Sequence, residues 1–506
     1  MALPAVKLNV VDNGLAQAIP GSGPTQYVIG GGDQGPYWQV IESTNPNDFT
    51  TQNGNGPGVD LAGFIANSTG NAVAFVAVPL SGGTNTAVSQ IIPGGSTSVV
   101  SVSGTPNDTM YCRATVVTGG TIGVAGIQIA VSIDNNRTTF NTYNLGTASS
   151  LVVSISGGAR TGLTLNFAAG ALVAGDYFTW VSTEGVWTDA AIQSAINCLL
   201  PLPTLVPEDL IIAGGSAQRN GVGTVGIQPG DVSVFDGYMT TLFNKKRFNR
   251  LLCQAGDALW GGASTETEAT WLTSLESSYA TTVSTNGRVS VSAGHYNVVS
   301  PYSQAQFRRS LLWPAAARDA AVAIQVDLGR VKDGALANMP NSPPPTPDGF
   351  IYHDENVNPG LDAARFMSAL RYPNRPGFFV ANPNIMCNPG SDFNWLQHGH
   401  VIDAACLIAY NFFLDELSDS VRVGSTGTIL PQDANDLQKR CNQQLAAGLT
   451  NNGAVSSAVC IVSLTDLILV TATLNVTVSI QPLGYLKAID VTLTFTNVAA
   501  VTVQQQ

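Results

Sequence analysis

The feature that most constrains this fold is a strict alternation of apolar and polar residues close to the C-terminus. Every even position from Ile468 to Ile480 is apolar, and Thr, Asn or Ser occupies every odd position from Thr471 to Ser479. Side chains alternate between the two faces of a β-strand, so this pattern predicts a long strand with one apolar face and one polar face.

A second alternating run follows the turn-forming sequence Gln481-Pro482-Leu483-Gly484. Its apolar positions are Ile489, Val491, Leu493 and Phe495. A strand at a chain end offers backbone N–H and C=O groups to another chain, so we interpret this tail as an intermolecular pairing device. The alternative interpretation is an ordinary last strand of the chain's own core. A shorter run at the other end predicts a similar strand and has its apolar residues at Val6, Leu8 and Val10.

Composition limits the classes of partner. Charged residues make up only 11% of the 506 residues, against about 25% in an average soluble protein. A polar but uncharged surface has little to prevent it from packing against copies of itself. The net charge of -12 argues against direct nucleic-acid binding, which needs a basic face, and against insertion at anionic membranes.

The seven cysteines are widely spread, with no CxxC or Cys/His zinc spacing. This pattern predicts reduced thiols and synthesis in a cytosol. The N-terminus lacks the charged and apolar regions of a signal peptide. No metal and no cofactor are expected.

The patterning predicts an α+β, multidomain chain. Residues 1–14 are expected to form a strand arm, and 15–70 the N-terminal part of the core with a linker that shows little periodicity. Short punctuated strands predict an inserted all-β domain, sandwich- or barrel-like, over 71–186. An α/β core is expected over 187–400 and a C-terminal domain over 401–506, with its arm starting near residue 486.

Helical spacing of apolar residues predicts a helix from Thr188 or Asp189 and several later ones. These are expected at 231–250, 266–280, 315–326, 362–370, 401–417 and 431–449. In the last of them, Ala434, Leu437, Cys441 and Leu445 form the stripe expected to be buried. Gln438, Lys439 and Asn442 are then expected to project outward.

No short catalytic motif occurs in the chain, and we expect no enzyme activity. His398 and His400 stand close to Asp403, but their spacing fits no standard metal site, so a polar loop before a helix is favoured. The sequence His353-Asp354-Glu355 could serve as an acid–base cluster, although its surroundings favour an exposed loop. The basic run Lys245-Lys246-Arg247 is interpreted as a solvated helix face or an ion-pair patch. The glycines between 214 and 223 are interpreted as a loop.

Three stretches resemble the contractile tail sheath proteins of bacteriophages. The C-terminal order of two helices and two long strands resembles the sheath C-terminal domain, and Pro482 to Phe495 resembles its closing strand. The stretch from Thr161 to Phe167 resembles the end of the β insertion in such proteins, and Leu3 to Val6 resembles their N-terminus.

The resemblance implies a structural subunit that polymerises as stacked rings around the tail tube and contracts to drive the tube through the host envelope. Terminal strands of neighbours would complete each other's sheets. The implied partners are further copies of this chain, the tube protein, and baseplate and tail terminator proteins, in a virion assembled from chains made in the host cytoplasm. It also implies a tube-facing helix that carries Gln438, Lys439, Arg440 and Asn442. The alternatives are the sheath of a phage-derived injection particle, and a β-rich enzyme or capsid component with buried terminal strands.

Overall fold

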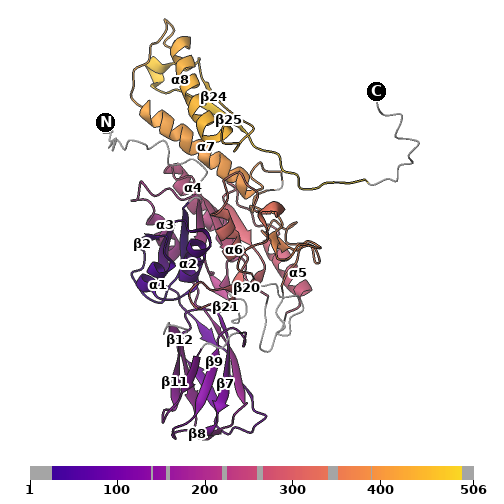
Figure 1. The fold of residues 1–506 in the computed structure, drawn as a ribbon. Coiled ribbons are helices and arrows are strands. Elements are labelled where there is room, and N and C mark those ends of the chain that lie inside the picture. The colour runs from indigo at the N-terminus through magenta and orange to yellow at the C-terminus, as the bar shows by residue number, and fades with distance from the viewer. Residues whose placement is uncertain are drawn as a thin grey trace, which may run out of the picture.

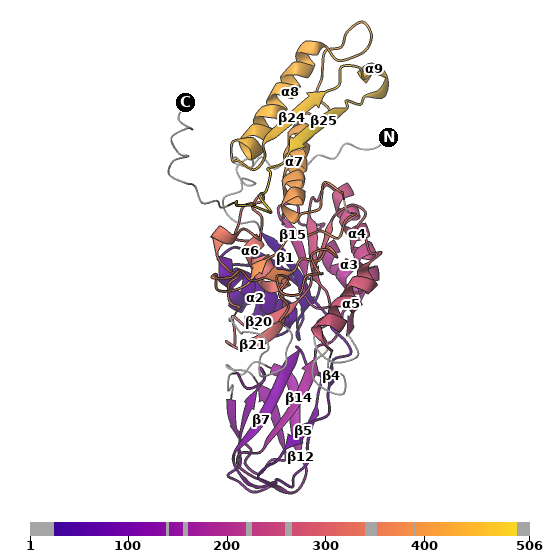
Figure 2. The ribbon, with the colours of Figure 1, turned by 90° about the vertical axis from the view of Figure 1, so that its right-hand side faces the viewer.

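The computed structural model describes residues 25–137, 141–154, 160–218, 225–258, 266–339, 352–388 and 390–492. The fold is mixed α/β, with several separate sheets and nine α-helices among these residues. It is elongated: a small lobe that carries the C-terminal hairpin lies at one end, an α/β body in the middle, and a β-rich lobe at the other end (Figures 1 and 2). No helix in the described part of the chain is long and apolar enough to cross a membrane.

The body is built on a six-stranded sheet in the order β19-β18-β15-β1-β3-β2. Five of its strands are parallel, and only β2 runs antiparallel, against β3. The central strand β1 is buried along its whole length, as expected for a parallel sheet that is covered on both faces. The strands are β1 (Gln26–Gly31), β2 (Val40–Ser43), β3 (Val73–Val78), β15 (Asp209–Ile212), β18 (Arg250–Gln254) and β19 (Val289–Ser292).

Helices cover both faces of this sheet. Side chains of β1 alternate between two apolar clusters, with Val28 in one and Tyr27 and Ile29 in the other. The first cluster contains α1 (Pro46–Asn53), α2 (Pro57–Thr69) and α6 (Leu312–Asp319). The second contains α3 (Asp189–Asn197), α4 (Pro229–Asn244) and α5 (Glu268–Tyr279). Helix α2 lies so close to β1 that a Cβ on Gly30 would come within 2.6 Å of the Gly58 Cα.

Several expectations from the sequence are wrong in this region. The described part of residues 15–70 belongs to the core, as expected, but it forms strands and helices where a linker was also expected, because β1 and α2 are buried whatever their periodicity. Strand β3 belongs to the body sheet and not to the β-rich region, since it pairs with β1. The helix expected at 362–370 is a series of turns that ends in β22 (Ala369–Leu370). The helix expected at 315–326 is α6, which starts and ends earlier.

The β-rich lobe leaves the body after β3 and returns before α3. One antiparallel sheet has the order β10-β9-β7-β14-β4, with β5 also on β14, and a second has the order β11-β12-β6. A separate apolar cluster fills the lobe, but it also takes in Ala305 and Phe307 from the body. Its strands are β4 (Thr84–Asn85), β5 (Ser89–Ile91), β6 (Val100–Ser103), β7 (Met110–Thr118), β8 (Gly120–Thr121), β9 (Gln128–Ser132), β10 (Asn141–Asn144), β11 (Ser150–Ser154), β12 (Arg160–Phe167), β13 (Ala171–Leu172) and β14 (Tyr177–Thr183).

Three two-stranded pairs complete the body: β16 (Ala217–Gln218) with β17 (Val225–Gly226), β20 (His295–Val299) with β21 (Gln306–Ser310), and β22 with β23 (Phe379–Val380). The C-terminal lobe consists of α7 (Leu396–Asp415), α8 (Pro431–Leu445), β24 (Ser457–Val462), the short α9 (Ile468–Thr471) and β25 (Val476–Gln481). Helix α7 is rooted in the body and extends into this lobe (Figure 1).

Candidate strand-accepting edge

The C-terminal lobe is a β24–β25 hairpin packed on two helices. The stripe predicted on α8 is buried: Ala434, Leu437, Cys441 and Leu445 all lie in one apolar cluster with residues of α7 and both strands. Pro431 stands in the first turn of α8, where its missing N–H costs nothing. The helix stops being α-helical at Leu445 and continues as a π-helical turn over Ala446–Thr450.

The outer edge of β24 is capped by side chains of α8. Asn442 Oδ1 accepts from the Cys460 amide at 2.7 Å, and Asn442 Nδ2 donates to the Cys460 carbonyl at 3.3 Å. Gln438 Oε1 accepts from the Val462 amide at 3.3 Å. The expectation that Gln438 and Asn442 project outward is therefore wrong, because both amides are turned onto the backbone of β24. At this edge the amide and carbonyl of Cys460 and the amide of Val462 are therefore already bonded within the subunit.

The outer edge of β25 is open. Its only strand partner in the described part of the chain is β24, in antiparallel register. The Ser463 amide donates to the Asn475 carbonyl, so the odd-numbered positions of β25 face β24. Antiparallel ladders alternate, which leaves the backbone groups of Val476, Val478 and Ile480 directed away from β24.

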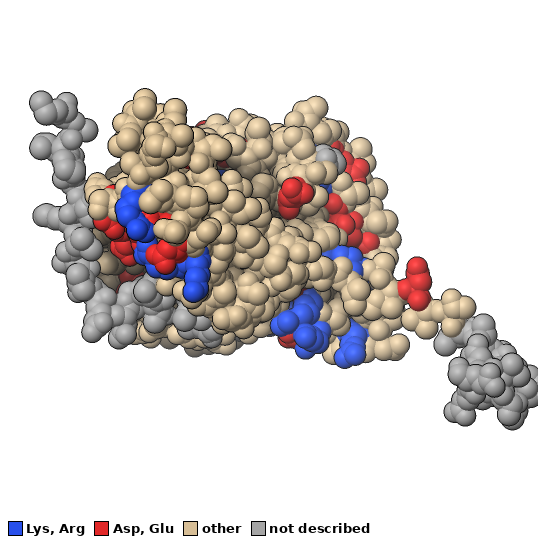
Figure 3. Space-filling view, turned by 90° about the horizontal axis from the view of Figure 1, so that it is seen from above, with Lys and Arg blue, Asp and Glu red and all other residues tan. Residues whose placement is uncertain are grey.

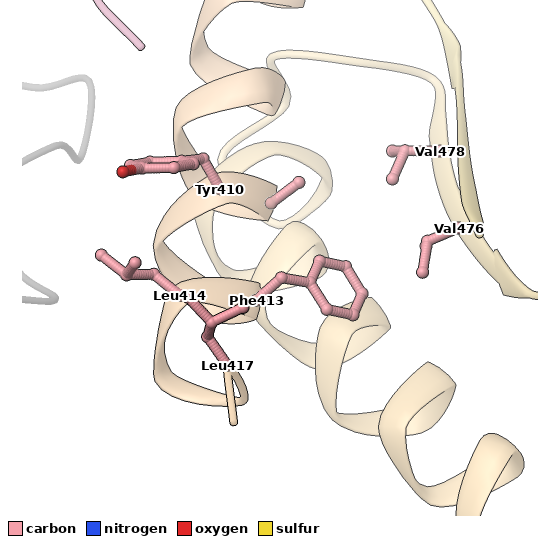
Figure 4. A pocket seen from close by; sticks show the side chains of 7 residues that line it. Tyr410, Phe413, Leu414, Leu417, Val476 and Val478 are labelled. Carbon is pink, nitrogen blue, oxygen red and sulfur yellow. The ribbon is translucent and has the colours of Figure 1, made fainter. Parts of the chain in front are cut away.

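An apolar groove of ≈ 330 Å³ lies beside β25. One wall comes from α7 and the other from Val476 and Val478, and Phe413 points across toward these two valines (Figure 4). Leu417, just after the end of α7, is 64% exposed. The remaining lining residues are Ala409, Tyr410 and Leu414.

The long strand predicted from 468 to 480 is only partly formed. Residues Ile468–Thr471 form α9, and Ala472 has a left-handed backbone with φ of 50°. Asp466 holds this loop, because its carboxylate accepts from the amide and the side chain of Asn475 at 2.6 and 3.0 Å. Alternation continues through residues that are not extended, and only the six residues of β25 pair with β24.

The predicted terminal strands are not paired where the structure describes them. Ile489 and Val491 are each 72% exposed and belong to no strand. Leu493 and Phe495 lie outside the described residues, as do Val6, Leu8 and Val10. The described arm runs away from both the hairpin and the body (Figure 1).

The two bases on α8 differ in their surroundings. Lys439 is exposed. Arg440 forms ion pairs with Glu416 at the end of α7 and with Asp436 one turn earlier on α8. Its guanidinium also lies 5.7 Å from the ring centre of Phe412. Arg440 thus ties α8 to α7.

His398 and His400 do not converge, and the expectation of a loop before a helix is wrong, because both lie in the first turns of α7. His400 lies between Glu208 and Asp209, with Nδ1 3.2 Å from Glu208 Oε1 and Nε2 3.0 Å from Asp209 Oδ2. Asp403 instead pairs with Arg250 and Arg288. Glu208, Asp209 and His400 form one group, in the part of the chain that the structure describes, whose ligand atoms are close enough to hold a metal ion. Burial lowers the pKa of His400 and raises that of Asp209. A cluster of neutral His400 and protonated Asp209 therefore accounts for the arrangement as well as a metal ion does.

The exposed loop expected around His353 is wrong. His353 is buried, with its ring nitrogens 3.0 Å from Glu268 and 2.9 Å from Glu355. Burial alone would lower the pKa of His353, but these two hydrogen bonds and charges raise it. Asp354 is also buried and accepts from Arg371 at 2.8 Å. The arrangement is a structural ion-pair cluster.

The basic run has a partly structural role. Arg247 donates to the carbonyls of Leu205 and Leu202 at 3.0 and 2.8 Å, which fixes the turn after α3. Lys245 and Lys246 are exposed. This run therefore includes one packed residue and two solvated ones.

No family model matches the chain, and no curated protein matches it. Among solved structures, it is similar to the sheath tail protein from Desulfitobacterium hafniense, with 12% identity, a TM-score of 0.42, and coverage of 95% of this chain and 100% of the other. It is also similar to the sheath tail protein from Listeria innocua, with 8% identity, a TM-score of 0.45, and coverage of 92% and 97%.

A third similar structure is the PVC sheath complex of an extracellular contractile injection system in its contracted state, with 8% identity, a TM-score of 0.48, and 99% coverage of both chains. All three are sheath proteins. They belong to the class that the sequence also resembles. The function proposed below rests on the geometry of this chain.

Proposed function

We propose that this chain is a structural subunit of a contractile tail sheath, which polymerises as stacked rings around a tail tube and contracts to drive the tube through a host cell envelope. The observation that carries the proposal is the open edge of β25 beside an apolar groove, on a chain that also carries exposed apolar residues at the alternate positions Ile489 and Val491 after the hairpin. Each subunit then has both an acceptor for a strand and a strand to donate.

The arm and the acceptor are complementary. A strand added beside β25 would bond to the outward backbone groups of Val476, Val478 and Ile480. Its inward side chains would lie on the apolar part of α7 around Phe413. The apolar positions of the arm, Ile489, Val491, Leu493 and Phe495, supply such a face. The N-terminal run at Val6, Leu8 and Val10 is the second candidate donor.

The surface suits assembly from copies of one chain. Seen from the hairpin end, the molecule shows mostly residues other than Lys, Arg, Asp and Glu, with charged side chains gathered in a few clusters (Figure 3). The partners in this role are further copies of this chain in homo-oligomeric rings, a tube protein, and baseplate and terminator proteins. The assembly would be a virion or a related injection particle. The role is structural and involves no catalysis and no membrane insertion.

Helix α8 is proposed to face the tube. Of the four residues predicted for this face, Gln438 and Asn442 are used on β24, which leaves Lys439 as the exposed base and Arg440 as a base shared with Glu416. A weak polar contact through Lys439 suits a surface that must separate on contraction, because exposed ion pairs contribute only roughly 0–1 kcal/mol each.

The β-rich lobe is proposed to be an inserted all-β domain that decorates the outside of the assembly. In support, it leaves and rejoins the body next to the central sheet, and it has its own apolar cluster. It also lies at the opposite end of the molecule from the strand-accepting edge (Figure 2).

The variant Val478→Pro tests strand acceptance. The Val478 amide faces away from β24, so its removal leaves the hairpin bonded within the subunit but blocks a strand on the open edge. We expect Val478→Pro to be folded by circular dichroism and to form no rings or tubes in negative-stain microscopy. Val478→Thr is the matched control, since it keeps the N–H and the β-branched shape, and it should assemble.

Normal tubes from Val478→Pro would contradict strand addition at β25. Discrete particles from the wild-type chain, in place of rings or tubes, would contradict the sheath role itself.

A further inference from the structure

The segment that joins β25 to the arm is bound to the body at one point. Tyr485 donates from Oη to the Gln325 carbonyl at 2.6 Å. Its ring packs near those of Trp395 and His398, at centroid distances of 6.1 and 5.6 Å. The root of α7 and the loop after α6 thus form a seat for this tyrosine.

Lys487 makes a second contact at the same place. Its ammonium forms an ion pair with Asp327 and lies 4.9 Å from the ring centre of Trp395. Asp327 is held in position by bonds from the Gly329 amide at 2.8 Å and from Gln397 Nε2 at 3.1 Å. Leu486, between the two anchoring residues, is 87% exposed, so only alternate side chains are bound.

The contacts of Tyr485 and Lys487 with the body are called the anchor here. They use residues that the arm would need in order to fold back onto β25. β25 ends at Gln481, and the apolar positions of the arm begin at Ile489. Between them stands a turn-forming sequence, so the two alternating segments could pair within one chain as an antiparallel hairpin. Residues 482–488 would then form its loop, but in the structure Tyr485 and Lys487 are seated on the body.

Without this anchor, pairing of the arm with β25 of its own chain would compete strongly with pairing between two copies. A strand tethered by a short flexible loop acts at an effective concentration in the millimolar range. A subunit whose own arm fills the β25 edge could accept no arm from a neighbour. A tethered arm and a free acceptor on the same chain therefore need a device that keeps them apart.

We infer that Tyr485 and Lys487 are positioning residues that direct the arm away from the β25 edge of its own chain and so reserve that edge for a second copy. The inference rests on the proposed strand-accepting function. Anchoring and self-pairing compete for the same short segment, so loss of the anchor shifts the chain toward a closed subunit that neither donates nor accepts.

The test measures binding of a fluorescent peptide of residues 486–506 to soluble subunits by anisotropy. Three chains are compared: the chain that ends at residue 487, the full-length Tyr485→Ala/Lys487→Ala variant, and the same double variant that ends at residue 487. A full-length Leu486→Ala variant is the control for polymerisation. We expect both shortened chains to bind the peptide with similar Kd. The full-length double variant should bind at least tenfold more weakly, because its own arm occupies the edge.

Polymerisation gives a second readout. The full-length double variant should stay folded but unassembled, whereas Leu486→Ala should assemble like the wild type. Equal peptide binding by the full-length and shortened double variants would overturn the inference, since a merely stabilising anchor would not make acceptance depend on the arm. Failure of the shortened wild-type chain to bind any peptide would instead overturn the strand-accepting function.

Discussion

At the scale of single residues, neighbouring charges on α8 have different roles. Arg440 is engaged by Glu416 and Asp436 within the chain, whereas Lys439 is exposed beside it. From the sequence alone, both residues were expected to lie on the helix that faces the tube. Of these two bases, only Lys439 can offer its charge to a second protein without first breaking a contact inside the subunit.

Reversal of charge at Lys439 is therefore the cleaner test of a tube-facing helix. Lys439→Glu should leave the melting temperature and tube-free polymers unchanged while it reduces assembly of the sheath around tubes, scored by electron microscopy. Arg440→Glu is the comparison, and it should lower stability modestly because it places a third acid beside Glu416 and Asp436. Normal sheathed tails with Lys439→Glu would place the tube contact elsewhere.

At the scale of elements, α8 protects one edge of the hairpin and leaves the other exposed. Natural sheets guard their edges because an unprotected edge invites pairing with any available strand. Here Asn442 and Gln438 cover part of the β24 edge, so the open edge of the hairpin is the one on β25.

Asn442→Ala should weaken this protection. It removes two hydrogen bonds to Cys460, for an expected loss of about 1–3 kcal/mol. That loss should speed hydrogen exchange of the Cys460 amide by about tenfold per 1.4 kcal/mol. Gln443→Ala, at an exposed position of the same helix, should leave that amide unchanged. Unchanged exchange at Cys460 in Asn442→Ala would show that the edge is protected by something other than this side chain.

At the scale of the whole molecule, the β-rich lobe is joined to the body through a buried charge cluster. Arg309 of β21 donates to both oxygens of Asp108 at 2.6 Å and to Asp60 of α2 at 3.1 Å. Asp108 lies in the loop before β7, so this arginine holds the base of the lobe against the body. The lobe's apolar cluster crosses the same boundary through Ala305 and Phe307.

The limits of the lobe can be tested with two fragments. Residues 80–187 should give a β-type circular dichroism spectrum and a cooperative melt, since they contain both antiparallel sheets. Residues 71–186, the limits expected from sequence, should aggregate, because they carry the six buried residues of β3 without its partner strands. A random-coil spectrum from 80–187 would show that the lobe needs Phe307 and Arg309 to fold.

The sequence predicted those elements whose patterns are local. The helix start expected at Thr188 or Asp189 is confirmed, with Thr188 as the N-cap, and so is the buried stripe of α8. The 468–480 run was partly wrong, because alternation describes which residues are apolar and not whether the backbone stays extended. A left-handed residue at Ala472 and the Asp466–Asn475 bonds break that strand.

The sequence by itself determined four features: an alternating arm, an amphipathic helix, a low-charge composition and the absence of a short catalytic motif. The tertiary structure alone decided which edge of the hairpin is open, because that depends on where α8 places Asn442 and Gln438. It also decided that His400 meets Glu208 and Asp209, which are almost 200 positions away in the sequence. Contacts between distant segments arise from packing of whole elements, and no local pattern encodes them.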